Sequence, residues 1–326
     1  MTRTLANPQL EPVLDRLGVP AGDAHDLPTS AKRFPDGAQY RVEIPSTEDA
    51  DALEAVLEEA ERLDVPIHRV SQGSGVFMLT DEELDRYALS AAMARVEVSL
   101  FARPNAAWVA SATTLTPSGG SLKPAARGMD QVLDAADDIL RAARHGIRSV
   151  LIGDVGVLSL FHELRSAEAL PATMQAKVSV MLPASNPLTA KVLVGLGAST
   201  LNLPTDLELT QIAAIRQAVD VPLDLYVEAP SDLGGFNRFH QIPELIRIAA
   251  PVYIKLGLRN GPDIYPSGAH LRETALAMSR ERVRRARLAI ELLSRSGYEA
   301  STSARGAEGL AIPVGINVTM EREGER

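Results

Sequence analysis

Short apolar stretches alternate with longer segments of helical periodicity from about residue 40 to residue 296. The stretch at 97–102 alternates between one face with Glu97, Ser99 and Phe101 and another with Val98, Leu100 and Ala102, as in a strand. At 50–63, apolar residues recur every three or four positions, as on one face of a helix. The strand-like stretches lie at 40–45, 66–71, 96–103, 149–154, 176–181, 200–203, 223–228 and 252–256. Strands that alternate with helices eight times predict an α/β protein with a (β/α)8 TIM-type barrel.

The pattern divides the chain into three parts. Residues 1–38 form an N-terminal arm or a cover for the barrel bottom, with a short helix at 12–17, and residues 39–296 form the barrel. Residues 297–326 form a C-terminal extension, in which 311–318 could add a strand. The long connection at 104–126 holds the single tryptophan, and we expect it to close over the site because long loops in compact domains are usually functional.

Barrels of this type carry their chemistry at the carboxyl ends of the strands. The polar residues expected there are Glu43, Gln72, Arg103, Asp154, Ser179, Asn202, Glu228 and Lys255. Glu228 and Lys255 end adjacent strands and can meet if both side chains point inward. Lys255 is then a candidate base or Schiff-base nucleophile, or one half of a structural Lys–Glu pair.

Three carboxylates at the predicted strand ends suggest a metal site as a second interpretation. Glu43, Asp154 and Glu228 could hold Mg²⁺ or Mn²⁺, because these ions prefer oxygen ligands. Asp154 could equally contact substrate or cap the following helix. The six histidines show no metal-ligand spacing, and we expect His68 and His240 to lie nearest the site as substrate contacts.

Composition narrows the function classes. The formal net charge of −9 disfavours nucleic acid and anionic membrane surfaces as partners. No apolar run reaches the roughly 20 residues that a membrane span needs, so we expect a cytoplasmic protein. The chain has no cysteine, which excludes thiol nucleophiles and cysteine-held iron–sulfur clusters.

Four motifs between about residue 147 and residue 293 resemble a known family. They are Ser149–Val157, the pair Ser179 and Asn186, Leu196–Leu207, and Lys255–Arg259 followed by Tyr265. Together they resemble the collagenase-like peptidase family U-32, whose catalytic domain is an eight-stranded barrel. The chain departs from the family pattern where Gly257 replaces an acid, Glu228 replaces a histidine and Asp232 falls near the first cysteine.

The resemblance implies a hydrolase-like enzyme. We expect it to act at the barrel top on a small polar, carboxylated substrate, either a small molecule or a peptide, with Glu228 or Asp154 moving the proton. Arg103, Lys255 and Arg259 would bind the anion, because cationic side chains pair with carboxylates. The substrate-contact set is completed by Ser179, Asn186, His68, His240 and Tyr265.

Two alternatives stay open. One is a lyase-like or aldolase-like step through Lys255. The other is a non-catalytic partner subunit of a heteromeric complex. The resemblance implies this alternative because the cysteine ligands of the family's iron–sulfur cluster are missing here, the closing motif is eroded, and some family members work as paired subunits. The chain could also form homo-oligomers.

Overall fold

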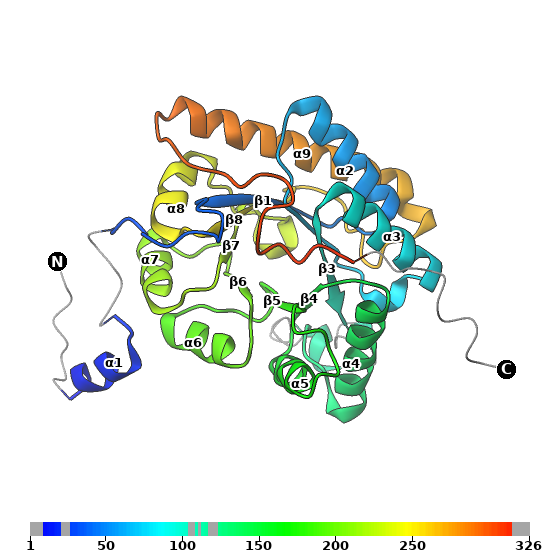
Figure 1. Cartoon of the computed structure of the whole chain (residues 1–326), viewed down its shortest axis with the longest axis horizontal. Helices are drawn as coiled ribbons and strands as arrows, with labels where there is room; N and C mark the ends of the chain where they lie inside the picture. The colour runs from blue at the N-terminus through cyan, green and yellow to red at the C-terminus, as the bar shows by residue number, and fades with distance from the viewer. Residues whose placement is uncertain (1–8, 21–26, 104–107, 110–111, 117–122, 315–326) are drawn as a thin grey trace.

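The computed structural model describes residues 9–20, 27–103, 108–109, 112–116 and 123–314, and eight parallel strands in it close into a barrel in chain order. The helices surround these strands (Figure 1). The predicted (β/α)8 barrel is therefore confirmed. The strands are β1 (Tyr40–Pro45), β2 (Arg69–Ser71), β3 (Glu97–Ala102), β4 (Ser149–Ile152), β5 (Gln175–Val178), β6 (Thr200–Asn202), β7 (Leu223–Glu228) and β8 (Val252–Leu256).

A helix follows each strand, and short 3₁₀ turns line several loops. The α-helices are α1 (Glu11–Leu17), α2 (Ala50–Leu63), α3 (Asp81–Ala94), α4 (Gly128–Arg144), α5 (Val155–Ser166), α6 (Pro187–Gly195), α7 (Leu209–Ala218), α8 (Ile242–Ala249) and α9 (Arg272–Arg295). The 3₁₀ turns are η1 (Val76–Met78), η3 (Thr113–Leu115), η5 (Ser231–Leu233), η6 (Phe239–Gln241) and η7 (Ala269–Leu271). Within the described ranges, no helix is both long enough and apolar enough to cross a membrane.

The polarity of the barrel wall follows the two-residue period of its strands. Apolar side chains at alternate positions, such as Val42, Val98 and Ile254, join the hydrophobic core between the strands and the helices. The intervening positions hold buried polar and charged side chains, such as Glu43 and Asp224. The main apolar core therefore lies outside the barrel wall, and the barrel interior is polar.

Segments from both ends of the described chain close the amino-terminal end of the barrel. Phe34 packs edge-on against Tyr253 of β8, with ring centroids 5.3 Å apart. The red segment that follows α9 crosses the barrel (Figure 1), where Ser303 accepts a hydrogen bond from Nε of Arg41 at 2.8 Å. Here α1 buries no residue, and 311–314 form no strand; 315–318 lie outside the described residues.

Candidate active site at the barrel mouth

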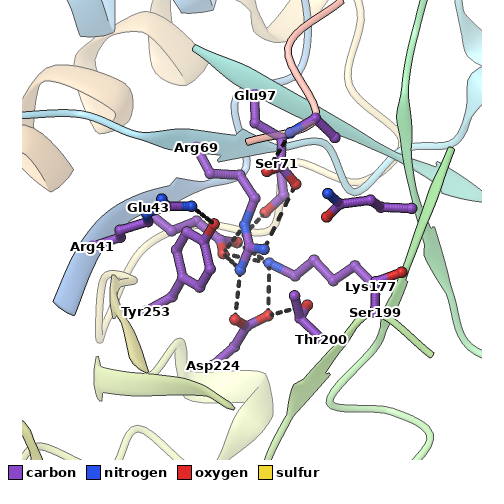
Figure 2. Close-up of polar contacts among 12 residues, drawn as sticks. Arg41, Glu43, Arg69, Ser71, Glu97, Lys177, Ser199, Thr200, Asp224 and Tyr253 are labelled. Atoms are coloured by element: carbon purple, nitrogen blue, oxygen red, sulfur yellow. Dashed lines mark hydrogen bonds and ion pairs between the residues drawn. The ribbon is translucent and has the colours of Figure 1, made fainter. Parts of the chain in front are cut away.

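A network of buried charges fills the barrel interior (Figure 2). Glu43 is fully buried and accepts hydrogen bonds from Nε of Arg69 at 2.7 Å, from Oγ of Ser71 at 2.7 Å and from Nζ of Lys177. Nη2 of Arg69 also lies 2.5 Å from Oδ1 of Asp224. We refer to Glu43, Arg69, Lys177, Asp224 and Lys255 as the lumen network.

The electrostatics of the lumen network follow from burial and from the balance of charge. Burial raises the pKa of Glu43, but the charges of Arg69, Lys177 and Lys255 outweigh this effect and hold the pKa well below its usual range. Burial lowers the pKa of Lys177 to about 7, and the positive charge of Arg69 adds to the shift. Glu43 is therefore an anion at neutral pH, whereas Lys177 can gain or lose a proton there.

Lys255 connects the lumen network to a cavity of about 130 Å³ at the carboxyl ends of the strands. Its Nζ atom lies 3.3 Å from Oε1 of Glu43 and 4.3 Å from the centre of the Tyr226 ring. The lining of this cavity, the barrel mouth, includes Arg103, Ser179, Asn202, Tyr226, Lys255 and Tyr265. The local sequence explains the position of Lys255, because alternation along β8 turns Val252, Ile254 and Leu256 to the core.

Arg103 brings a second cation to the barrel mouth. It follows β3, is 7 % exposed and forms no ion pair with any residue that the structure describes. Its guanidinium carbon lies 3.9 Å from the centre of the Trp108 ring. Burial lowers the pKa of Arg103 to about 10, so the side chain stays charged at neutral pH.

Two buried polar atoms at the barrel mouth lack a hydrogen-bond partner among the described residues. They are Nε of Arg103 and Oδ1 of Asn202. Buried polar groups are normally satisfied, so an unpaired donor and an unpaired acceptor on one cavity wall indicate a place for a polar ligand.

The structure brings together six of the residues that the sequence placed at the strand ends or proposed as substrate contacts. The six that line the barrel mouth are Gln72, Arg103, Ser179, Asn202, Lys255 and Tyr265. Oγ of Ser179 accepts a hydrogen bond from the backbone N–H of Met181 at 3.2 Å, and the hydroxyl of Tyr265 bonds to that of Ser46.

Glu228 does not meet Lys255, contrary to the expectation from adjacent strands. The pairing of β7 with β8 shifts register between Tyr226 and Glu228, so Tyr226 is the residue opposite Lys255. The Glu228 carboxylate instead accepts the backbone N–H of Arg259 at 3.0 Å and lies 3.2 Å from Nε of Arg285. Arg259 is not among the residues that line the barrel mouth.

Asp154 also lies outside the barrel mouth. Its carboxylate accepts the backbone N–H groups of Gly156 and Val157 at the start of α5, and that of Ala126 at 3.1 Å. These bonds assign it the helix-capping role that the sequence left open. The carboxylates of Asp154 and Glu228 therefore have different partners: the start of α5 for Asp154, and Arg259 and Arg285 for Glu228.

The predicted metal site is not present in the described part of the chain. No group of three or more His, Asp or Glu residues there is arranged to hold a metal ion. The set of Glu43, Asp154 and Glu228 fails because Glu43 is bound by the lumen cations and the other two serve a helix cap and Arg285. Metal binding by Glu43, Asp154 and Glu228 was therefore a wrong expectation.

The remaining predicted contacts lie elsewhere. His68 is fully buried, accepts the backbone N–H of Val42 at Nδ1 and contacts the Ser303 carbonyl through Nε2, at the closed end of the barrel. Asn186 caps α6 by accepting the backbone N–H of Thr189 at 2.9 Å. His240 is an exposed residue of η6. None of the three lines the barrel mouth.

Sequence reasoning missed most of the lumen network. Arg69, Lys177 and Asp224 were not singled out, and neither was Tyr226. The available signal was the two-residue alternation, which places these polar side chains opposite the apolar positions of their strands.

Comparisons with known proteins agree with the family resemblance. The model of Peptidase family U32 matches residues 127–229, roughly a third of the chain. The closing motif from Lys255 to Tyr265 lies beyond this match. No curated protein matches the chain.

Solved structures with similar folds are distant in sequence. A U32 peptidase aligns with a TM-score of 0.38 and 17% identity, over 69% of this chain and 96% of that one. A Rubisco-like protein from Rhodopseudomonas palustris aligns with a TM-score of 0.45 and 12% identity, over 89% of this chain and 72% of that one. The match at residues 127–229 supports the resemblance, and this part of the chain is similar to peptidase family U32.

Proposed function

We propose that the barrel mouth is the active site of an enzyme that binds a small carboxylated substrate through Arg103 and reacts through Lys255. The observation that carries this proposal is the environment of Arg103. A buried cation is costly unless an anion accompanies it, and Arg103 has no carboxylate partner among the described residues. A substrate carboxylate supplies that partner, since it matches the guanidinium fork.

The position of Lys255 favours a Schiff-base step over hydrolysis. The hydrolase-like mechanism expected from the sequence needs Glu228 or Asp154 at the substrate, and neither lines the barrel mouth. Lys255 does line it. Lys255 gives up a proton and attacks the carbonyl carbon of a 2-oxo acid, the same proton returns to the hydroxyl of the adduct, water leaves, and an iminium ion forms that draws electrons from the neighbouring carbon. This is a lyase-like or aldolase-like reaction.

The lumen network offers a route for the proton that Lys255 must lose before attack. Glu43 contacts the Nζ atoms of both Lys255 and Lys177. Lys177 has its pKa lowered to about 7, chiefly by burial, so it can accept a proton at neutral pH. We infer that Glu43 passes the proton between the two lysines.

Reductive trapping tests the proposal. The protein is incubated with pyruvate and cyanoborohydride, and the modified residue is located by peptide mass mapping. We expect one adduct at Lys255 that Lys255→Met abolishes and that Arg103→Gln slows at least tenfold at low pyruvate concentration, because an ion pair to a buried cation is lost.

Lys191→Met is the matched control, since Lys191 lies on α6 away from the barrel mouth. It should leave the adduct unchanged. If a panel of 2-oxo acids gave no adduct, or adducts only on lysines outside the barrel mouth, the proposed chemistry would be wrong.

A further inference from the structure

A second cavity, of about 600 Å³, adjoins the barrel mouth. Phe77, Met78, Trp108 and Val109 form its apolar wall, and each is between 38% and 48% exposed. The rings of Phe77 and Trp108 meet edge to face with centroids 6.2 Å apart. We refer to this cavity as the groove.

Arg103 is the residue that lines both the groove and the barrel mouth. Arg103 is only 7% exposed, and its guanidinium stacks on Trp108. Its Nε atom has no hydrogen-bond partner among the described residues. An anion that satisfies Arg103 therefore sits where the two cavities meet, with space on either side.

The rim of the groove is acidic. Asp134, Asp137 and Asp138 of α4 line it. Asp134 and Asp137 are exposed, whereas Asp138 is 9% exposed and its burial raises its pKa to about 7. The exposed pair favours a positive charge on whatever occupies the groove, and Arg103 favours a negative charge at its inner end.

We propose that the substrate is an elongated 2-oxo acid whose apolar, amine-bearing tail occupies the groove. Its carboxylate pairs with Arg103, its carbonyl faces Lys255, an aromatic or branched aliphatic segment packs on Phe77 and Trp108, and a terminal ammonium faces Asp134 and Asp137. The assignment of carbonyl chemistry rests on the proposed function, whereas the tail rests on the groove.

The apolar wall and the acidic rim of the groove contribute separately to the affinity for the substrate. An aromatic pair adds about two- to twelvefold in affinity beyond the contribution of its buried area, so about tenfold for the whole contact. An exposed ion pair adds less, about threefold. The two contributions can therefore be removed one at a time.

The test compares trapping of pyruvate, phenylpyruvate and 4-(aminomethyl)phenylpyruvate at sub-saturating concentration. We expect phenylpyruvate to be trapped about tenfold faster than pyruvate, and the amine to add about threefold. Phe77→Ala should reduce the ratio of phenylpyruvate to pyruvate about tenfold, and Asp134→Asn with Asp137→Asn should remove the preference for the amine. Leu89→Ala and Asp130→Asn, an exposed apolar residue on α3 and an acid of α4 outside the groove, should change neither ratio.

A binding measurement keeps the groove separate from the chemistry. Trp108 is the only tryptophan, so its fluorescence reports on the groove directly when 3-phenylpropionate, propionate and their amine analogue are titrated. Tighter binding of the phenyl compound than of propionate with no adduct at Lys255 would support the groove and overturn the proposed function. Equal binding of both compounds, with pyruvate still trapped, would overturn the groove proposal alone.

Discussion

Oε1 of Glu43 lies 3.3 Å from Nζ of Lys255, so the carboxylate of β1 directly contacts the lysine that faces the barrel mouth. The same carboxylate accepts a hydrogen bond from Lys177. Glu43 therefore does two things at once: it neutralises buried cations, and it couples the proposed reacting lysine to a second lysine that titrates near pH 7.

Replacement of Glu43 by glutamine should destabilise the fold by about 3 kcal/mol or more, because buried cations are left without their shared anion. Urea unfolding at pH 7 measures the change. Glu58→Gln is the control, since Glu58 is an exposed partner of Arg280 and should cost under about 1 kcal/mol. A Glu43→Gln protein as stable as this control would show that the lumen network does not balance charge as described.

His68 should make stability fall in mild acid. Burial lowers its pKa from 6.5 to about 4, so between these values the unfolded chain binds more protons than the folded one. Stability is therefore fully present above about pH 6.5 and is lost as the pH falls toward 4, by about 2–3 kcal/mol from this residue. Urea unfolding from pH 4 to pH 7 should show this slope, and His68→Asn should flatten it; an unchanged slope would place the titration in another group.

Asp138 should have the opposite effect on stability between about pH 4 and pH 7. Burial raises its pKa to about 7, so between about pH 4 and pH 7 the folded protein binds more protons, and stability falls as pH rises. Asp138→Asn should stabilise the protein at pH 8 by about 2 kcal/mol and have little effect at pH 4. Thermal unfolding at both pH values measures this, with Asp130→Asn as the exposed control on α4. A gain in stability of equal size at both pH values would contradict the raised pKa of Asp138.

Asp154→Ala should cost about 1 kcal/mol and leave the pyruvate adduct intact, because Asp154 caps α5 and does not line the barrel mouth. Asp154→Ser keeps a capping oxygen and should recover most of the loss. Chemical unfolding and adduct mapping on the same samples check both effects. Loss of the adduct without loss of stability would assign Asp154 to the chemistry after all.

The sequence predicted most of the fold because the barrel's strands have a clear two-residue pattern. The bounds of β1, β7 and β8 agree with the predicted segments at 40–45, 223–228 and 252–256. The segment at 66–71 was too long, since pairing in β2 begins only at Arg69. Pro66 and Ile67 share the strand's composition but lie outside its ladder.

The candidate site was less predictable, for physical reasons that one sequence does not reveal. The register shift after Tyr226 turns Glu228 toward Arg285, and no residue pattern in the sequence predicts this shift. Asp154 lies two residues after β4, at the position where α5 needs a cap, so two roles compete for one side chain. Lys255 and Arg103 could be found because Lys255 is the last but one residue of β8 and Arg103 directly follows β3, whereas the groove depends on contacts between segments far apart in the chain.

The charged interior also has a consequence for how the chain can be divided. A cut between β4 and β5 leaves Glu43, Arg69 and Glu97 in one half and Lys177, Asp224 and Lys255 in the other. The pair of Glu43 and Arg69 stays together, but Glu43 loses Lys177 and Lys255. Arg69 in turn loses Asp224. We expect the separated halves to stay unfolded alone and to reassemble when mixed, with a recovery that falls as salt concentration rises.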